Sequence, residues 1–181
     1  KKQSHLKQAT FAGGCFWCME PPYEGLDGVK SVVSGFSGGK KINPSYKDVA
    51  RGKTKHVEAV QITFDSKKVS FEKLMQIYWQ QIDPTDDKGQ FVDRGPHYRP
   101  VVFFHSEKQK EIFSKTKKQL EKAKIFSKKI KVEILPFKNF FPAEDYHQDY
   151  YKKSSTKYKY YRYGSGRDQF LDKYWGKNRD R

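Results

Sequence analysis

Cysteine and long apolar segments are scarce in this sequence, and acidic side chains are outnumbered by basic ones. Cysteine occurs only twice, at Cys15 and Cys18, in a chain of 181 residues. Two cysteines this close together do not supply the disulfide framework of a small secreted domain, so they form a redox pair, half of a metal site or two buried residues. No apolar run approaches the ~20 residues that cross a bilayer, which argues against a transmembrane helix. No signal peptide is visible.

The excess of basic over acidic residues gives the chain a strong positive charge. Lys and Arg number 37 against 21 Asp and Glu, a net charge of +16. Such a balance suggests nucleic acid, anionic surfaces or acidic partners. Most of the cations are Lys, which suits a solvated surface, whereas base and phosphate recognition relies on Arg. The stretch YKYYRYGSGR at 158–167 interleaves Tyr with cations, as a stacking surface does. No recognition module surrounds it, so nucleic-acid binding remains the alternative hypothesis.

The chain length favours one domain spanning 1–181. Alternating or apolar patterns predict strands at 7–12, 29–39, 56–65, 101–104 and 131–135. Capping residues and apolar stripes predict helices from Cys15 to about Glu24, over 70–83, from Ser106 to about Lys124 and over 167–175. A Gly/Pro/Asp-rich stretch at 83–100 predicts a long functional loop. The order strand–helix–strand–strand–helix–strand is typical of the ferredoxin-like βαββαβ pattern with additions.

The two cysteines carry the first chemical hypothesis. If Cys15 opens a helix after a strand, the partial positive charge of the helix N-terminus lowers the pKa of its thiol. Cys18 lies on the same helical face, within disulfide reach, so one thiol attacks and the other resolves. The alternatives are a zinc site that needs two further ligands, an inert buried pair, and a thioredoxin-like oxidoreductase with the same Cys-x-x-Cys turn.

The neighbouring aromatics and one acid narrow that hypothesis. Phe16 and Trp17 either pack in the core or wall an apolar pocket for a small group such as a methyl on sulfur. Glu58 begins a strand and shares a face with apolar residues. It either looks out to solvent or is buried, in which case its pKa rises and it is a candidate general acid. Tyr46 and Tyr98, in Gly/Pro-rich loops, offer hydroxyls. A thiolate, a proton donor and an apolar pocket together suggest reduction of an S=O group.

Several blocks then match one known family in order along nearly the whole chain. They are GGCFWCME, GFSGG, NPSYKDV, HVEAVQITFD, DPTDDKGQFVDRGPHYRPVVFF, AEDYHQDYY and GSGRDQFLDKYWG. The sequence resembles the A class of the peptide-methionine sulfoxide reductases. The resemblance implies an α/β two-layer sandwich on a ferredoxin-like core, with a mixed sheet, long loops and extra C-terminal helices. It also implies reduction of methionine-S-sulfoxide, free or in proteins, without a metal or organic cofactor.

The resemblance assigns roles to individual residues. Cys15 matches the nucleophile that attacks the sulfoxide sulfur and becomes a sulfenic acid. Glu58 matches the acid that protonates the oxygen. Tyr46 and Tyr98 match the hydroxyls that bond this oxygen, and Asp93 matches a polar residue that orients the site. Phe16 and Trp17 match the walls of the methyl pocket. The match extends to His147 and Asp149, which we interpret as structural.

Two positions depart from the family pattern. Many relatives carry Gly where Cys18 stands and keep resolving cysteines near the C-terminus, but here no cysteine follows residue 18 and Ser165 stands in that region. We expect a Cys15–Cys18 disulfide that a thioredoxin-like partner reduces, with an outside thiol or direct reduction as alternatives. Phe36 replaces a frequent Tyr, with no catalytic consequence. We further expect a cytoplasmic monomer that binds neither nucleic acid nor membrane, although the missing initial Met leaves an exported form open.

Overall fold

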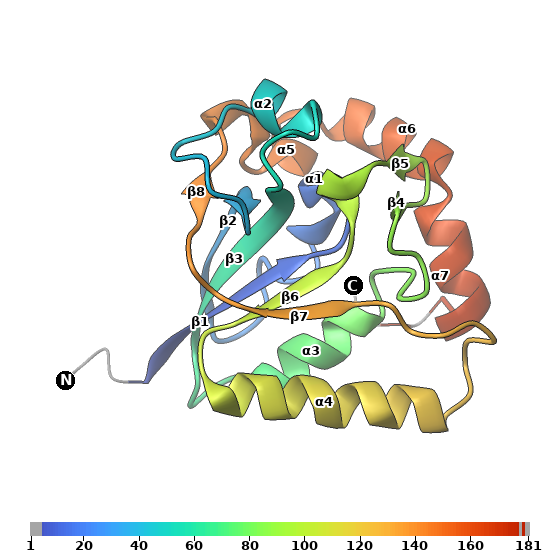
Figure 1. The fold of residues 1–181 in the computed structure, drawn as a ribbon. Helices are drawn as coiled ribbons and strands as arrows, with labels where there is room; N and C mark the ends of the chain where they lie inside the picture. Colours follow the sequence, from blue (N-terminus) through green and yellow to red (C-terminus); the bar gives the residue numbers. More distant parts are fainter. Residues whose placement is uncertain (1–4, 178, 180–181) are drawn as a thin grey trace.

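The computed structural model describes residues 5–177 and residue 179. A six-stranded sheet with the order β7-β6-β1-β3-β2-β8 forms its centre (Figure 1). Its strands are β1 (Leu6–Ala12), β2 (Val29–Ser37), β3 (Val57–Asp65), β6 (Val101–Phe104), β7 (Glu133–Pro136) and β8 (Phe141–Pro142). Two further short strands, β4 (Gly89–Gln90) and β5 (Asp93–Arg94), pair with each other inside the predicted long loop.

The four central strands confirm the predicted ferredoxin-like core. β1 pairs antiparallel with both β3 and β6, and β2 pairs antiparallel with β3. This order, β6-β1-β3-β2, places the first and third strands of the βαββαβ unit side by side. β7 adds to β6 in parallel, which makes the sheet mixed, as expected.

Seven helices and two 3-10 turns of the described chain lie between or after the strands along the sequence. They are α1 (Phe16–Met19), α2 (Tyr46–Ala50), α3 (Phe71–Trp79), α4 (Glu107–Lys122), α5 (Tyr150–Lys153), α6 (Ser155–Ser165) and α7 (Arg167–Trp175), with the 3-10 turns η1 (Pro96–Tyr98) and η2 (Asp145–His147). As predicted, Ser70 caps α3 by accepting from the amide of Lys73, and Ser106 caps α4 in the same way. Of the helices that the structure describes, none combines the length and apolar character needed to cross a bilayer.

The hydrophobic core lies between the sheet and the α3–α4 layer. Apolar side chains of β1 and β3 meet those of α3 there, and α4 adds Phe113 and Leu120. A smaller cluster covers the opposite face of the sheet, where Val57 and Ala59 of β3 join Val101 and Phe103 of β6. The alternation of β3 therefore has two buried sides, and Glu58 points to the side of the main core.

Three local predictions were wrong or incomplete. The predicted helix over 15–24 ends at Met19, because the prolines at 21 and 22 cannot continue it. The strand predicted at 131–135 begins two residues later. The Tyr-rich stretch that we considered a possible stacking surface forms most of helix α6, which the apolar pattern did not predict.

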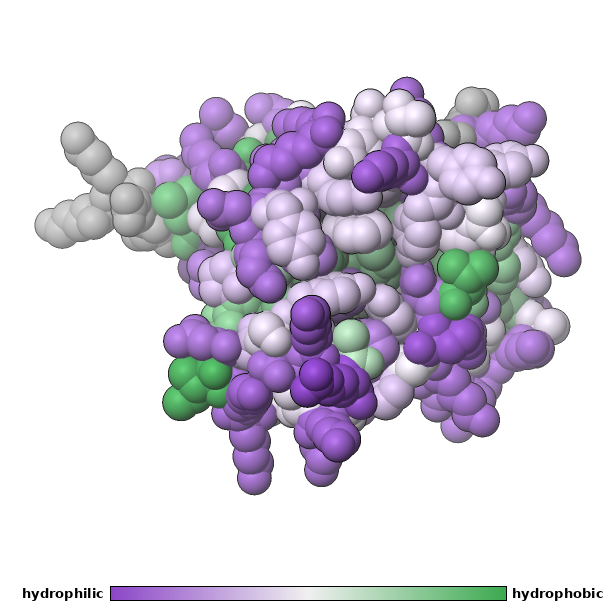
Figure 2. Space-filling model, turned by 90° about the horizontal axis from the view of Figure 1, so that it is seen from above, coloured by the Kyte–Doolittle hydropathy of each residue, from purple (hydrophilic) through white to green (hydrophobic). Residues whose placement is uncertain are grey.

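Several sequence blocks of the sequence analysis lie together at one end of the molecule. Helices α1, α2, α5 and α6 meet there beside β5 (Figure 1). Seen from this end, weakly polar side chains occupy the middle of the surface and hydrophilic ones surround them (Figure 2). Exposed tyrosines at 146, 160 and 163 come from η2 and α6. The candidate functional residues lie beneath this surface.

Candidate active site

Cys15 stands where β1 turns into α1. It is the N-cap of α1, and its carbonyl accepts a 3.1 Å hydrogen bond from the amide of Cys18. Gly14 before it has a φ of +92°, which a residue with a side chain rarely adopts, so glycine lets the chain reverse here. Cys15 is 6% exposed and Cys18 is fully buried. Both are free thiols and they hydrogen-bond to each other.

The charge of this pair differs from our prediction. Burial, then the hydrogen bond with Cys18, then the negative charge of Glu58 raise the pKa of Cys15 well above its usual value. The expected lowering by the helix N-terminus was wrong, because α1 has only four residues and the thiol is enclosed. Instead, the hydrogen bond from Cys15 lowers the pKa of Cys18 to about 6. Within this pair the negative charge is therefore favoured on Cys18 over Cys15.

Glu58 is buried, as one of our two interpretations required. It is 1% exposed near the start of β3, on the face that carries the main core. Its Oε1 accepts a 3.2 Å hydrogen bond from the amide of Phe16, and its Oε2 has no partner among the described residues. Burial raises the pKa of Glu58 to about 8, with the charges of Asp93 and Cys18 adding to the rise. At neutral pH this carboxyl carries a proton that it can donate.

Two tyrosine hydroxyls meet beside this carboxyl. Tyr46, the first residue of α2, and Tyr98, the last of η1, hydrogen-bond to each other. Burial, followed by the charge of Glu58, raises the pKa of Tyr46 to about 12, and the same two causes raise the pKa of Tyr98. Cys15 contributes to both shifts. The structure thus brings together the thiol, the acid and both predicted hydroxyls from four separate elements.

Asp93 lies at the edge of the same group. Its Oδ2 accepts a short hydrogen bond from the hydroxyl of Tyr161 in α6. Burial raises the pKa of Asp93. Its charge acts on Cys15, Cys18 and Glu58. Asp93 therefore adds a minor contribution to the electrostatics of the site, where burial is the dominant effect, and Tyr161 of α6 bonds to it.

The two aromatics after Cys15 have different surroundings. Phe16 is fully buried, and its ring packs on Phe36 at 5.7 Å and on His147 at 5.2 Å between centroids. Trp17 is half-buried, stacks on Tyr150 at 3.9 Å, and donates from Nε1 to Nδ1 of His147 at 3.1 Å. His147 thus serves as an anchor. The methyl-pocket role of Phe16 and Trp17 stays a prediction.

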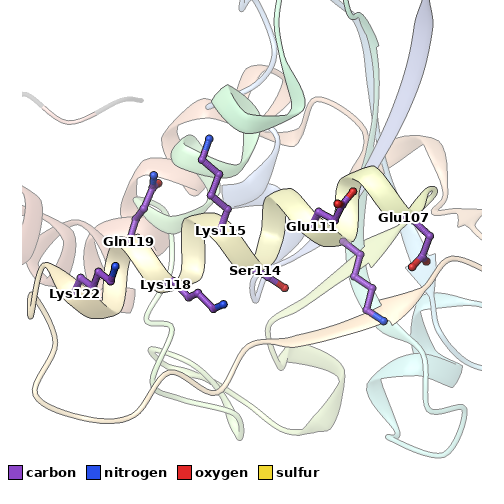
Figure 3. A pocket seen from close by; sticks show the side chains of 8 residues that line it. Glu107, Glu111, Ser114, Lys115, Lys118, Gln119 and Lys122 are labelled. Atoms are coloured by element: carbon purple, nitrogen blue, oxygen red, sulfur yellow. The ribbon is translucent and has the colours of Figure 1, made fainter.

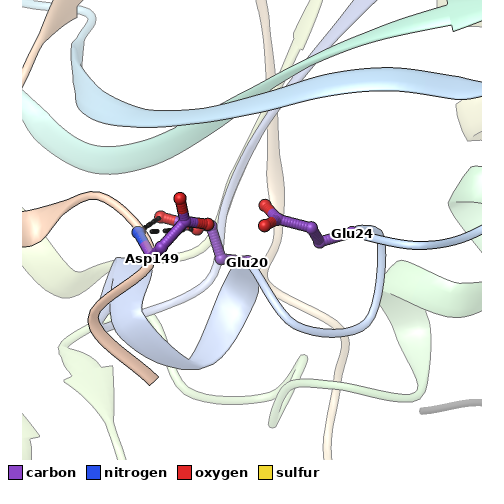
Figure 4. Close-up of side chains that lie close together, drawn as sticks. All are labelled: Glu20, Glu24 and Asp149. Carbon is purple, nitrogen blue, oxygen red and sulfur yellow. Dashed lines mark hydrogen bonds between the residues drawn. The ribbon is translucent and has the colours of Figure 1, made fainter. Parts of the chain in front are cut away.

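A cluster of three carboxylates lies behind α1. One oxygen each of Glu20, Glu24 and Asp149 fall within 4.8 Å of one another (Figure 4). Glu20 accepts hydrogen bonds from the Ser34 hydroxyl at 2.6 Å and from the Asp149 amide at 3.1 Å. The side chain of Lys152 pairs with Glu24 at 2.9 Å. These internal bonds tie the end of α1 to the start of α5, which agrees with our structural interpretation of Asp149.

One broad hollow of the surface lies away from this site. A depression of about 640 Å³ runs along α4 and is lined by charged and polar side chains of that helix alone (Figure 3). It contains none of the predicted site residues. Its breadth reflects long side chains that stand away from the helix, so shape alone does not locate the chemistry.

Sequence reasoning missed three residues of this region. Tyr161 bonds to Asp93, Tyr150 covers Trp17, and the buried side chain of Arg167 reaches the carbonyl of Gly13. All three lie in C-terminal segments that approach α1 only in the folded chain. A helical pattern in which Tyr158, Tyr161 and Ser165 share one face was the available signal.

The comparisons with known proteins place this geometry in a class of oxidoreductases. The family model described as peptide methionine sulfoxide reductase matches residues 7–179. Peptide methionine sulfoxide reductase MsrA 2 of Staphylococcus aureus is 55% identical over 168 residues, which cover 93% of this chain and 95% of that protein. Peptide methionine sulfoxide reductase MsrA/MsrB of Vibrio cholerae is 51% identical over 98% of this chain, which spans 47% of that longer protein.

The solved structures agree. Mxr1 of Saccharomyces cerevisiae in its reduced form superimposes with a TM-score of 0.78 at 31% identity, covering 84% of this chain and 87% of that one. Mxr1 has also been solved in complex with Trx2. The chain belongs to the peptide methionine sulfoxide reductase family, and its relatives named above carry the MsrA name.

Proposed function

We propose that this enzyme reduces methionine-S-sulfoxide, free or within proteins, at Cys15. The thiol sulfur attacks the sulfoxide sulfur while Glu58 protonates the oxygen. Methionine leaves, Cys15 becomes a sulfenic acid, and the proton that Cys15 loses replaces the one that Glu58 gives. Sulfoxide sulfur is thereby reduced by two electrons and cysteine sulfur is oxidised by two. No metal or organic cofactor takes part in this scheme.

One observation carries this proposal: a buried, protonated carboxyl sits beside a buried thiol. Oε1 of Glu58 is fixed by the amide of Phe16, and Oε2 is left with no partner among the described residues. A neutral acid in such a place is a competent donor to a polar S=O oxygen. Tyr46 and Tyr98, which already bond to each other, would turn their hydroxyls to the same oxygen.

The environment of Trp17 supports an apolar seat for the substrate methyl. Its ring is flanked by Tyr150, His147 and Tyr161, so one edge of the indole remains for contact. Its orientation is fixed by the hydrogen bond to His147. We assign the methyl pocket to this indole together with the rim of Phe16. Asp93 orients the site through its charge and its bond to Tyr161.

The second half of the cycle falls to Cys18. Its thiol is held against Cys15 and is poised to displace hydroxide from the sulfenic acid, which forms a disulfide and releases water. A dithiol partner of the thioredoxin type then returns both cysteines to their reduced form, in keeping with the Mxr1 complex with Trx2. The proposal includes a single catalytic domain that acts as a monomer in the cytoplasm.

The test is an assay with each epimer of methionine sulfoxide and dithiothreitol as reductant. We expect methionine from the S epimer and none from the R epimer. Turnover of the R epimer alone would assign the enzyme to another class, and no turnover would refute the proposal. An insulin-reduction assay run in parallel tests the alternative, a general disulfide oxidoreductase. Such an enzyme would reduce insulin, and it would do so equally well without Glu58.

A further inference from the structure

Arg167 is a buried cation that makes no direct ion pair with a carboxylate among the described residues. Its side chain begins α7 and is 1% exposed. The guanidinium donates to the carbonyls of Gln81 at 2.7 Å and Gly13 at 3.1 Å, lies 3.8 Å from the sulfur of Met19, and covers the ring of Phe91 at 4.8 Å. All of these partners are neutral. In the described part of the chain no carboxylate pairs with Arg167.

A buried charge without an ionic partner is costly, so its retention calls for a physical reason. The neighbouring Arg162 shows the usual solution, because it pairs with Asp168 at 2.9 Å. Arg167 has no such pair, although the cost of burying it is at least as large. The negative charges on which the cation of Arg167 acts belong to Cys18 and Asp93, both at the candidate site.

The position of the guanidinium points to the cysteine turn. One nitrogen bonds to the carbonyl of Gly13 and lies so close to Gly14 that an added Cβ would be 2.7 Å away. The other nitrogen faces Met19, which directly follows Cys18. The guanidinium thus touches the segment on both sides of the two cysteines. After the hydrogen bond from Cys15, the charge of Arg167 is the next influence that lowers the pKa of Cys18, and Arg162 follows it.

The two cysteines also differ in exposure. Cys18 is fully covered, whereas Cys15 keeps a small exposed area. An external thiolate can approach only the sulfur that it can reach, and disulfide exchange is faster when the departing thiol has the lower pKa. Both conditions favour attack on Cys15, with Cys18 as the departing thiol.

We propose that Arg167 is a positioning residue for the resolving thiol, and that its guanidinium balances the Cys18 thiolate so that the reductant attacks the Cys15 sulfur. In this step the attacking thiolate forms a bond to Cys15, the Cys15–Cys18 bond breaks, and Cys18 leaves as a thiolate beside Arg167. The second thiol of the reductant then attacks the first sulfur of the reductant, which is bonded to Cys15. The reductant becomes a disulfide and Cys15 is released. The inference rests on the disulfide relay of the proposed function.

The first test measures the thiolate directly. In a Cys15→Ser background the remaining thiol is Cys18, and its ionisation can be followed by thiolate absorbance against pH. We expect Arg167→Met to shift the titration upward, with a roughly tenfold lower thiolate fraction at a pH below both midpoints, since one pH unit corresponds to a factor of ten. Arg167→Lys should restore most of the thiolate. Arg94→Met removes an exposed arginine paired with Asp86 and should change nothing.

The second test locates the attack. A thioredoxin whose resolving cysteine is replaced by Ser traps the mixed disulfide with the oxidised enzyme, and peptide mapping identifies the bonded cysteine. We expect Cys15. A bond to Cys18, or an unchanged Cys18 titration in a folded Arg167→Met protein, would overturn the proposal. If Arg167→Met does not fold, the proposal is tested by the Cys18 titration in Arg167→Lys and by the cysteine that the mapping experiment identifies.

A single-turnover measurement distinguishes failure of this inference from failure of the proposed function. One equivalent of methionine formed by the reduced wild-type enzyme without external reductant reports only the first step. If wild type gives no methionine, the proposed function fails. If wild type gives it, and cycling in Arg167→Met slows no more than in Arg94→Met, only the role of Arg167 fails.

Discussion

The amide of Phe16 donates a hydrogen bond of 3.2 Å to Oε1 of Glu58. This bond joins the residue after Cys15 to an acid 42 positions further along the chain. It leaves Oε2 of Glu58 as the oxygen free to act on a ligand. The contact therefore fixes both the place of the acid and which of its oxygens faces the chemistry.

Replacement of Glu58 by Gln should abolish most of the activity. Glutamine keeps an oxygen that can accept from Phe16, so the local structure should survive, but it has no acidic proton. We expect single-turnover methionine formation to slow by about 10²–10⁴-fold, the usual contribution of a general acid. Stopped-flow or quenched assays of methionine release measure this directly.

A suitable control for Glu58→Gln is Glu133→Gln, at an exposed position whose partner is Arg99. That variant makes the same chemical change far from the thiol and should keep the wild-type rate. Wild-type activity in Glu58→Gln would show that another group protonates the oxygen.

Activity should decline at alkaline pH as Glu58 ionises. Burial raises the pKa of Glu58 to about 8, so the rate of the first step should fall above this pH. The charge of Asp93 contributes to that rise, so Asp93→Asn should move the decline to lower pH. Asp86→Asn removes an equal charge from the same loop, where it pairs with Arg94, and should leave the profile in place. An upward movement in Asp93→Asn would contradict this assignment.

Stability should also depend on the ionisation of Glu58, and in the same direction of pH. The pKa of Glu58 is raised from 4.5 to about 8 on folding, so its contribution is full below about pH 4.5 and is lost as pH rises through 8. Glu58→Gln cannot ionise. We therefore expect the free energy of unfolding of the variant, relative to wild type, to improve between pH 5 and 9 by on the order of a few kcal/mol. Urea titrations at both pH values test this, and a difference that stays constant would contradict it.

Much of the fold follows from local patterns that act over short distances. The alternation in β3 and the capped, amphipathic α3 could be predicted because each pattern is complete within about ten residues. Their pairing order followed from the sequence of element types. Helix α6 was missed since its inward side chains, Tyr158, Tyr161 and Ser165, are polar or aromatic and spaced among lysines. Tyr161 became recognisable as part of a packing face only against Trp17 and Asp93.

The residues of the site could be predicted from the sequence, but the charge states of Cys15, Cys18 and Glu58 could not. Burial of Glu58 was one of two interpretations of its position, and the three-dimensional packing decided between them. The thiolate was expected on Cys15, but a four-residue helix gives little field. The cations that favour charge on Cys18 come from residues 162 and 167, which no local pattern connects with the Cys-x-x-Cys turn.

Replacement of Cys18 by Ser should separate the two halves of the cycle. Cys15, Glu58 and both hydroxyls remain, so the variant should still form about one equivalent of methionine per enzyme. A serine cannot form a disulfide with the Cys15 sulfenic acid, so recycling by thioredoxin should be lost. Mass spectrometry after one turnover should find a sulfenic acid at Cys15 in the variant and, in wild type, the loss of two hydrogens on the peptide with both cysteines.

The decisive comparison is between reductants. A small thiol can reach the exposed edge of Cys15 and attack a sulfenic acid directly, so dithiothreitol should support some cycling of Cys18→Ser while thioredoxin does not. The single-turnover yield serves as the internal control, because it depends on the first step alone. Full thioredoxin-driven turnover in Cys18→Ser would mean that the sulfenic acid is reduced without a resolving cysteine, and the charge that Arg162 and Arg167 place near residue 18 would then need another explanation.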